Sequence, residues 1–428
     1  MRTYLKITTL SPLHIGAGED FIPTGYIIDR EMLYEFDETD FYHELSSMDK
    51  RGLLTAADQG LHALKNFYES HKELAKRISY RQIPVSREIA NRYRKQYNKD
   101  GSLNNNRLEI AKTVYQGASR LPYIPGSSLK GVIETAMGTY VEKGTNEERQ
   151  NLQVSDFFTD EPSTVCGFAM RRHKHKEKAG KGIPVMVESV KKDTIFWGTV
   201  SSEKKGLSDQ LYSIEDMLNS METFSKNAEE NMFSEFKKIA PKESHVFRIG
   251  RFVGQNFTAV NLRKSPVTHS LFTMDKTSYI PFGWIYAEIV SVEQFEDALD
   301  HYVQKSEERI SSLRTLREKR ERERILRQKE EEEKVRKKAE EEARRKAEAE
   351  AEAARLASLS PVDRLLEEND IPTLINMMKS GEIDNYDEIK VELARKIKER
   401  LMRDPKTWEK AKKKAADRKR FIQGILGE

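Results

Sequence analysis

The chain has 428 residues, enough for two or three domains of ordinary size. Charged residues make up 34% of it, above the ~25% of an average globular protein, and most of the excess lies after residue 305. The net charge of +4 is compatible with a polyanionic partner, and the single cysteine, Cys166, excludes an internal disulfide and a zinc finger.

The first residues do not form the apolar core of a secretory signal, because Lys6 interrupts the apolar run. Elsewhere no segment approaches the roughly 20 apolar residues that a membrane span requires. These patterns predict a soluble, cytoplasmic protein without a membrane partner.

Residues 1–300 predict one mixed α/β domain that opens with a strand and a glycine loop. The strand covers Tyr4 to Leu10, with Leu5 and Ile7 on one face, and the loop covers His14 to Gly18. Further strands are expected at 26–29, 32–36, 122–125, 154–158, 165–171, 184–190, 194–201, 247–249 and 278–290. Helices are expected at 39–44, 55–77, 129–136 and 213–239, and an exposed loop at 104–106.

The remaining chain predicts two helical regions. Residues 301–358 consist mainly of Glu, Lys, Arg and Ala, with favourable pairs such as Glu333 with Lys337. Apolar residues are too sparse for sustained heptads, so we expect a single solvated helix or linker rather than a strong coiled coil. Residues 359–428 predict a small helical bundle, whose first helix begins at Ser360 and Pro361.

The segment from Tyr123 to Gly131, Tyr-Ile-Pro-Gly-Ser-Ser-Leu-Lys-Gly, carries the clearest chemical signal. Pro125 and Gly126 turn the chain, and Ser127 or Ser128 is suited to cap the helix that follows. Lys130 then lies in the first helical turn, where the helix dipole disfavours a cation unless an anion is also present. Free backbone N–H groups, hydroxyls and an ammonium together suit a phosphate. An ordinary capped helix with an exposed lysine fits the same residues.

Two other glycine-rich segments are candidate sites. The first is Gly16-Ala17-Gly18 with His14 beside it, which fits either close approach to a ligand or a histidine buried under a loop. The second runs from Phe247 to Phe257 and combines glycines, arginines and aromatic rings, as phosphate contact with base stacking would need. A buried strand and turn would explain it equally well.

Taken together, the glycine loop after the first strand, the Pro-Gly-Ser-Ser-Leu-Lys helix start and the late Gly-Arg turn before Pro-Phe-Gly-Trp resemble the RAMP superfamily of CRISPR proteins. Within that superfamily, the pattern is most similar to the end-capping backbone subunit of the type III-A (Csm) interference complex. The resemblance covers about residues 1–295.

This resemblance implies an α+β fold, with an RRM- or ferredoxin-like core elaborated by insertions. It also implies binding of the 3′ part of a CRISPR guide RNA through its phosphates, beside other RAMP backbone subunits, with host nucleases as further partners in guide maturation. By motif position, the RNA-binding residues would be His14, Gly16, Gly18, Ser127, Ser128, Lys130, Arg248, Gly250, Arg251 and Gly254.

We expect no catalytic residues, no metal and no cofactor. Glu19 and Asp20 lie near the place where related backbone subunits carry a cleaving acid, but the capping subunit is not expected to cut its target. One alternative is a metal-independent RAMP endoribonuclease that cleaves repeat RNA, with His14 as general base. Another is a helical scaffold that acts through its C-terminal half.

Overall fold

The computed structural model describes residues 2–95, 108–138, 152–172, 179–180, 182–202, 212–254, 257, 269–404, 408–409, 412 and 414–428. The chain divides into two compact units, Met1–Arg324 and Ile325–Glu428. The first unit contains mixed sheets and helices, and the second is helical. Among the described helices, none has both the length and the apolar composition of a membrane span.

The largest described sheet of the first unit, sheet A, is antiparallel in all its described strand pairs. It follows the order β13-β16-β1-β12-β9-β7, with β8 also paired to β12. Its strands are β1 (Arg2–Thr9), β7 (Tyr123–Ile124), β8 (Leu152–Val154), β9 (Phe157–Phe158), β12 (Ile195–Ser202), β13 (His245–Arg248) and β16 (Trp284–Val290). Alternation along β1 directs Leu5 and Ile7 into the core, as predicted.

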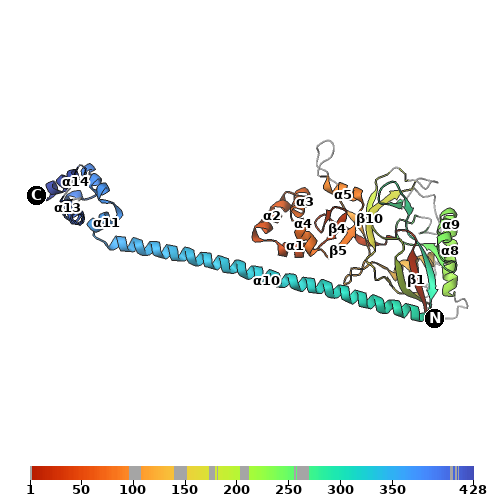
Figure 1. The fold of residues 1–428 in the computed structure, drawn as a ribbon. Coiled ribbons are helices and arrows are strands. Elements are labelled where there is room, and N and C mark those ends of the chain that lie inside the picture. Colours follow the sequence, from red (N-terminus) through yellow and green to blue (C-terminus); the bar gives the residue numbers. More distant parts are fainter. Residues whose placement is uncertain are drawn as a thin grey trace. The chain divides into compact units, whose positions relative to one another are not determined.

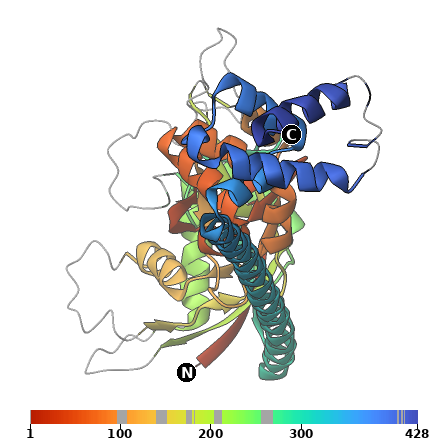
Figure 2. The same ribbon diagram turned by 90° about the vertical axis from the view of Figure 1, so that its left-hand side faces the viewer.

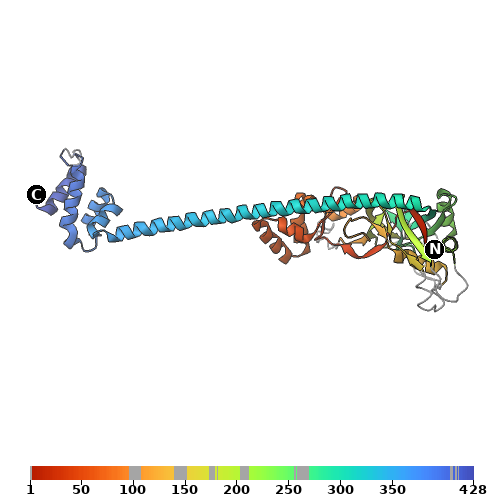
Figure 3. The same ribbon diagram turned by 90° about the horizontal axis from the view of Figure 1, so that it is seen from below.

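Helices cover both faces of sheet A. On one face, α6 (Gly126–Ala136) and α8 (Ile214–Ala228) share a hydrophobic core with β1, and α9 (Glu230–Ile239) continues this layer (Figure 1). On the other face lies the beginning of α10 (Val292–Ser358) (Figure 3). Phe295 packs against Tyr4 and Phe158, with ring centroids 4.9 and 5.8 Å apart, and Tyr302 also packs on Phe158 at 4.5 Å.

Sheet B follows the order β15-β14-β10-β11-β6-β2. Its strands are β2 (Gly16–Phe21), β6 (Ile110–Thr113), β10 (Thr164–Arg171), β11 (Val185–Val190), β14 (His269–Thr273) and β15 (Ile280–Pro281). The β6–β11 pair is parallel, and the other pairs are antiparallel. Leu13, in the segment that follows β1 of sheet A, forms an isolated antiparallel bridge with Val190 of β11 in sheet B.

Sheet C is a meander of β3 (Tyr26–Asp29), β4 (Met32–Glu35) and β5 (Arg81–Pro84). Between β4 and β5 the chain forms α1 (Glu38–Glu44), α2 (Ser47–Asp58), α3 (Leu61–Ser70) and α4 (Lys72–Ile78), and α5 (Arg87–Arg94) follows β5. A second hydrophobic core joins these elements to Cys166 and Phe168 of β10. Because Cys166 is fully buried there, burial raises the pKa of its thiol.

The second unit contains the end of α10 and a bundle of α11 (Pro361–Glu368), α12 (Ile371–Ser380), α13 (Tyr386–Met402) and α14 (Lys414–Leu426), drawn in blue in Figure 2. Ser360 caps α11 by accepting from Asp363 N–H at 3.1 Å, and Pro361 occupies the first turn, as the sequence predicts. The bundle core includes the fully buried Leu393 and Ile397 of α13.

The predicted glycine loop at 14–18 is wrong in its second half, which is strand β2. The strand pairs with β6, and its register shifts between Gly16 and Asp20. Gly18 adopts a φ of +82° within this irregularity, as glycine does readily at a β-bulge. Pairing across the sheet therefore overrides the local turn signal.

Two predicted helices are interrupted. The helix expected at 55–77 is part of three helices, because Gly60 adopts a φ of +96° and ends the first of them. The helix expected at 213–239 breaks at Glu229, which leaves helical geometry with φ −152° and ψ 74°. The carboxylate of Glu229 forms ion pairs with Arg172 and Arg248, so tertiary contacts fix this break.

Other boundaries also differ from the prediction. Residues 278–290 form β15 and β16, which belong to different sheets rather than one strand pair. The long charged helix α10 begins at Val292, and the first compact unit extends to Arg324, so the predicted division at 300 falls inside α10. The predicted loop at 104–106 lies outside the described residues.

Candidate functional site

Two of the three glycine-rich segments meet in the structure. The turn after β13 packs on the chain before β2, where Arg251 N–H donates to the carbonyl oxygen of His14 at 2.8 Å. Gly250 has a φ of +99°, and a Cβ atom there would lie 2.7 Å from the same carbonyl oxygen. Gly250 is therefore required by both backbone conformation and close approach.

The meeting point, which we call the glycine junction, consists of His14, Gly16, Gly250 and Arg251. Gly16 and Arg251 are exposed there, so backbone and a guanidinium face solvent together. Gly18 is also exposed, two residues farther along β2, and a Cβ atom there would have nothing within 4 Å among the described residues. A Cβ atom on Gly16 would lie 3.6 Å from Arg251 Nη1 and 3.7 Å from His14 Nε2. The structure thus brings predicted residues from two distant segments to one place.

His14 is fully buried at the base of the junction. Its Nδ1 atom lies 2.6 Å from the carbonyl oxygen of Glu188, and its Nε2 atom has no hydrogen-bond partner among the described residues. Burial lowers the pKa of His14 to about 4; the contact with Glu188 opposes this shift, and the nearby Arg251 cation adds to it. The imidazole is therefore neutral at pH 7.

Arg248 and Gly254, two further predicted RNA-binding residues, are less exposed than Gly16 and Arg251 of the junction. The Arg248 side chain is buried, where Nε donates to Phe282 O at 2.6 Å and Nη1 pairs with Glu229 at 3.0 Å. Burial lowers the pKa of Arg248 to about 10, although Glu229 opposes the shift. Its guanidinium is thus engaged inside the protein, whereas Gly254 is partly exposed with a φ of +92°.

The start of α6 is built differently from the predicted capped turn. Neither Ser127 nor Ser128 caps the helix; Pro125 is the N-cap residue, and no side-chain cap bond forms. Instead, the carboxylate of Asp156 accepts from Gly126 N–H at 2.8 Å. An internal anion therefore already satisfies one of the backbone donors on which phosphate binding would depend.

The other predicted residues of α6 remain near the surface. Ser127 is exposed, and Ser128 and Lys130 are partly exposed. Lys130 Nζ donates to the carbonyl oxygen of Leu152 at 3.0 Å, so its ammonium already makes a contact within the protein. Ile15 and Leu129 share the core of sheet A, which ties the helix start and the glycine junction to the same rigid layer.

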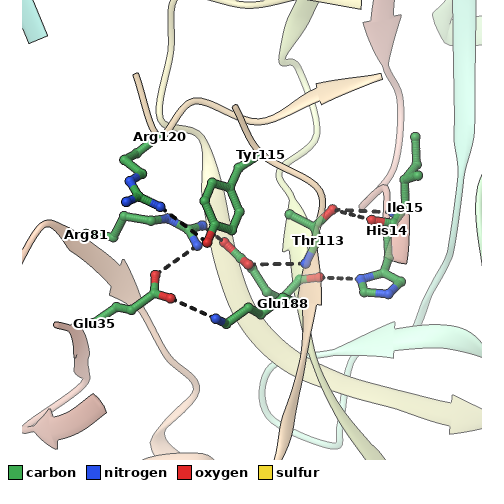
Figure 4. Close-up of polar contacts among 9 residues, drawn as sticks. His14, Ile15, Glu35, Arg81, Thr113, Tyr115, Arg120 and Glu188 are labelled. Atoms are coloured by element: carbon green, nitrogen blue, oxygen red, sulfur yellow. Dashed lines mark hydrogen bonds and ion pairs between the residues drawn. The ribbon is translucent and has the colours of Figure 1, made fainter. Parts of the chain in front are cut away.

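A buried charged network reaches His14 of the glycine junction through Glu188 (Figure 4). Arg81 lies between Glu35, at 3.1 Å, and Glu188, while Lys112 pairs with Glu35 at 2.9 Å. Glu188 Oε2 also accepts from Thr113 N–H at 3.2 Å. Burial raises the pKa of the Glu188 carboxyl, although Arg81 opposes the shift. This network was not predicted from the sequence, because its members are single charges within apolar strands.

Glu19 and Asp20, the acidic residues of β2, are not part of a metal-binding cluster among the described residues. Glu19 and Asp20 are exposed, and Glu19 lies 3.8 Å from Lys112. Among the described residues, no group of three or more His, Cys, Asp or Glu side chains is arranged to hold a metal ion.

Comparison with known proteins identifies the family of this chain. The sequence profile of the RAMP superfamily matches residues 6–357 of this chain. The chain therefore belongs to the RAMP superfamily, and that prediction is confirmed. It is also similar to Csm5, a CRISPR system protein of Streptococcus thermophilus, with 30% identity over 159 residues. This match spans 35% of the chain and 42% of the relative, less than half of either.

Two solved structures share a weaker likeness of shape. One is described as a Csm-crRNA-target RNA ternary complex of a type III-A CRISPR-Cas system; the likeness has a TM-score of 0.48 and 16% identity, and covers 67% of this chain and all of that chain. The other is Csm5 of T. onnurineus, with a TM-score of 0.41, 13% identity and the same coverage. Both scores lie below 0.5.

Proposed function

We propose that this chain is a guide-RNA-binding subunit of a type III-A CRISPR effector complex, where it holds the 3′ part of the guide and caps the backbone of related subunits. Membership of the RAMP superfamily and the partial similarity to Csm5 support this assignment. The observation that carries it is the glycine junction, where exposed backbone and Arg251 lie together on a rigid support.

A ferredoxin-like core is part of this proposal. In chain order, β1, α6, β9, β12, α8 and β16 alternate as strand-helix-strand-strand-helix-strand. Their order in the sheet, β16-β1-β12-β9, supports the arrangement, as does the shared helical layer. RRM domains bind bases on the open face of such a sheet. Here the beginning of α10 covers that face, so the proposed RNA path runs along the loops instead.

The proposed contacts are with the RNA backbone rather than with base edges. Arg251 and Lys130 would supply cations, and the glycine backbone would allow close approach of phosphates. Because such contacts carry little sequence information, we expect similar affinity for guides of unrelated sequence. Arg248 is left out of the proposed surface, since its guanidinium is bound to Phe282 and Glu229.

Co-expression with neighbouring subunits tests the proposal. Guide RNA should co-purify with the wild-type complex, and Arg251→Ala should weaken RNA binding and flatten its salt dependence by up to ~0.7 in the slope of log K against log salt. Arg51→Ala is a matched control, because Arg51 is also exposed but lies on α2, away from the junction. A complex that assembles without RNA would refute guide binding.

The second candidate is a metal-independent endoribonuclease. The neutral Nε2 of His14 favours it, because a general base needs an unprotonated nitrogen. Incubation of the purified chain with repeat RNA in EDTA tests this alternative. A site-specific product that disappears when the ribose at the cut is replaced by deoxyribose would establish the nuclease and overturn the non-catalytic proposal.

A further inference from the structure

The hydrogen bond between His14 and Glu188 fixes which histidine nitrogen carries the proton. A carbonyl oxygen only accepts hydrogen bonds, so Nδ1 must be the donor at the observed 2.6 Å. With a neutral ring, the other nitrogen, Nε2, then carries a lone pair and accepts. The charged network holds Glu188 in place, because its side-chain carboxylate is bound to Arg81 and to Thr113 N–H.

The unsatisfied Nε2 is placed directly below the exposed glycine junction. Within the part of the chain that the structure describes, it is a buried acceptor without a partner, which is unfavourable in the free protein. Gly16 and Arg251 lie beside it, because a Cβ atom on Gly16 would be 3.7 Å from Nε2 and 3.6 Å from Arg251 Nη1. The Phe252 ring packs on the imidazole, with ring centroids 5.2 Å apart. When Arg251 turns toward a phosphate, a small donor can approach Nε2 over Gly16.

The chemistry of Nε2 restricts what that donor is. Phosphate oxygens only accept, so the histidine cannot bind them directly in this tautomer. The sugar-phosphate backbone of RNA offers one donor, the ribose 2′-hydroxyl, and DNA lacks it. A junction with an arginine for the phosphate and a fixed acceptor beside it therefore matches one ribonucleotide unit.

We infer that His14 Nε2 accepts a hydrogen bond from a ribose 2′-hydroxyl, so that the glycine junction selects RNA over DNA. This inference rests on the proposed function, and it adds a role for His14 as a specificity-determining residue rather than a catalytic one. Arg251 binds the adjacent phosphate in the same unit.

The test compares binding of the full chain to single-stranded RNA and to the same sequence with 2′-fluoro ribose, which cannot donate from that position. His14→Asn retains an amide donor where Nδ1 faces Glu188 O but lacks the Nε2 acceptor. His14→Gln places an amide oxygen near the Nε2 position. Affinities at one fixed salt concentration are compared for the wild type and both variants, after circular dichroism has established that they are folded.

Wild-type protein should bind RNA more tightly than the 2′-fluoro strand. His14→Asn should weaken RNA binding by roughly 5-fold, the effect of one net hydrogen bond, and leave 2′-fluoro binding unchanged. His14→Gln should retain part of the preference. Equal loss on both strands in His14→Asn would overturn the inference and assign His14 a structural role.

The wild-type measurement separates this inference from the proposed function. Tight RNA binding with equal affinity for the 2′-fluoro strand overturns the role of His14 and leaves guide binding intact. Absence of RNA binding, by the chain and by its complex, refutes both. If a variant does not fold, the wild-type comparison of the two strands still decides whether 2′-hydroxyl donors contribute.

Discussion

At the scale of single residues, the first unit depends on charges that are buried but balanced. Arg81 is only 4% exposed and lies between two carboxylates that are less exposed still. Burial acts to lower the pKa of Arg81, but Glu188 and Glu35 raise it overall. Such a network adds little net stability when complete, whereas loss of one member leaves an uncompensated buried charge.

Replacing Arg81 should therefore destabilise the first unit strongly. We expect Arg81→Met to lower the free energy of unfolding by about 3–5 kcal/mol, because Glu188 loses its cation inside the protein. Urea denaturation measures the change. Arg322→Ala is the matched control, since its pair with Glu318 is largely exposed and should contribute nothing measurable. Similar effects for both variants would contradict this account.

His14 should make stability depend on pH in a defined direction. Its folded pKa of about 4 is below the ordinary 6.5, so the unfolded chain binds the proton first as pH falls. The stabilisation that the neutral His14 side chain gives to the folded state is complete above about pH 6.5. It is lost as the pH falls toward 4, by up to about 3 kcal/mol. Urea denaturation of the wild type and of His14→Asn across this pH range isolates the effect. The difference between their free energies of unfolding should become smaller as the pH falls.

At the scale of elements, the contacts at the start of α6 differ from those that its sequence motif predicts. The Pro-Gly-Ser-Ser-Leu-Lys pattern predicts the helix correctly, but Asp156, 30 positions downstream of Gly126, reaches its first N–H group. A phosphate at this terminus would meet the negative charge of Asp156. The exposed hydroxyl of Ser127 and the cation of Lys130 would favour the same phosphate.

Two substitutions separate these opposing effects. Asp156→Asn keeps an oxygen acceptor for Gly126 N–H and removes the charge, so RNA affinity should rise by about 2- to 5-fold at low salt if a phosphate binds there. Lys130→Ala should weaken binding regardless of sequence and flatten the salt dependence. Asp58→Asn, on exposed α2, is the control. Unchanged affinity in both test variants would exclude α6 from the RNA surface.

At the scale of the whole molecule, α10 has two different roles along its length. Its first turns belong to the first unit, where Tyr302 Oη donates to Gln116 at 2.5 Å and Arg309 Nε donates to Ser119 O at 2.5 Å. Between 331 and 355 every side chain is exposed, and charged pairs such as Glu333 with Lys337 at 2.7 Å follow the helix. Solvent-facing pairs of this kind support a helix without requiring a core.

Truncation at two points along α10 should show that only its first part stabilises the first unit. Residues 1–324 should unfold cooperatively with the stability of the first unit in the full chain. Residues 1–291 should be less stable by at least ~2 kcal/mol, because Phe295 and Tyr302 no longer cover sheet A. Thermal and urea denaturation measure the difference. Equal stability of the two fragments would show that α10 contributes nothing to the first unit.

The bundle should fold without the rest of the chain. The described part of residues 359–428 contains four helices around a shared apolar core, so the isolated fragment should be helical and melt cooperatively. Leu393→Ala should cost about 2–5 kcal/mol, since Leu393 is fully buried. Val391→Ala, on the exposed side of α13, should change little. Circular dichroism of the three fragments provides the measurement.

Sequence patterns were sufficient where a feature depends on near neighbours. Strand alternation in Tyr4 to Leu10 and the start of α11 at Ser360 were both predicted, because periodicity and capping act over a few residues. The motifs also led to the RAMP superfamily. Two of the three predicted glycine-rich segments lie together in the folded chain.

Features that depend on distant partners could not be predicted in this way. Arg81 and Glu188 are 107 positions apart, and their pairing decides which buried charges are tolerated. Arg248 looks like a surface arginine in its motif, yet Glu229 and Phe282 hold it inside. The tautomer of His14 depends on a carbonyl 174 positions away. Local preferences carry no information about such contacts, because packing of whole sheets and helices brings the partners together.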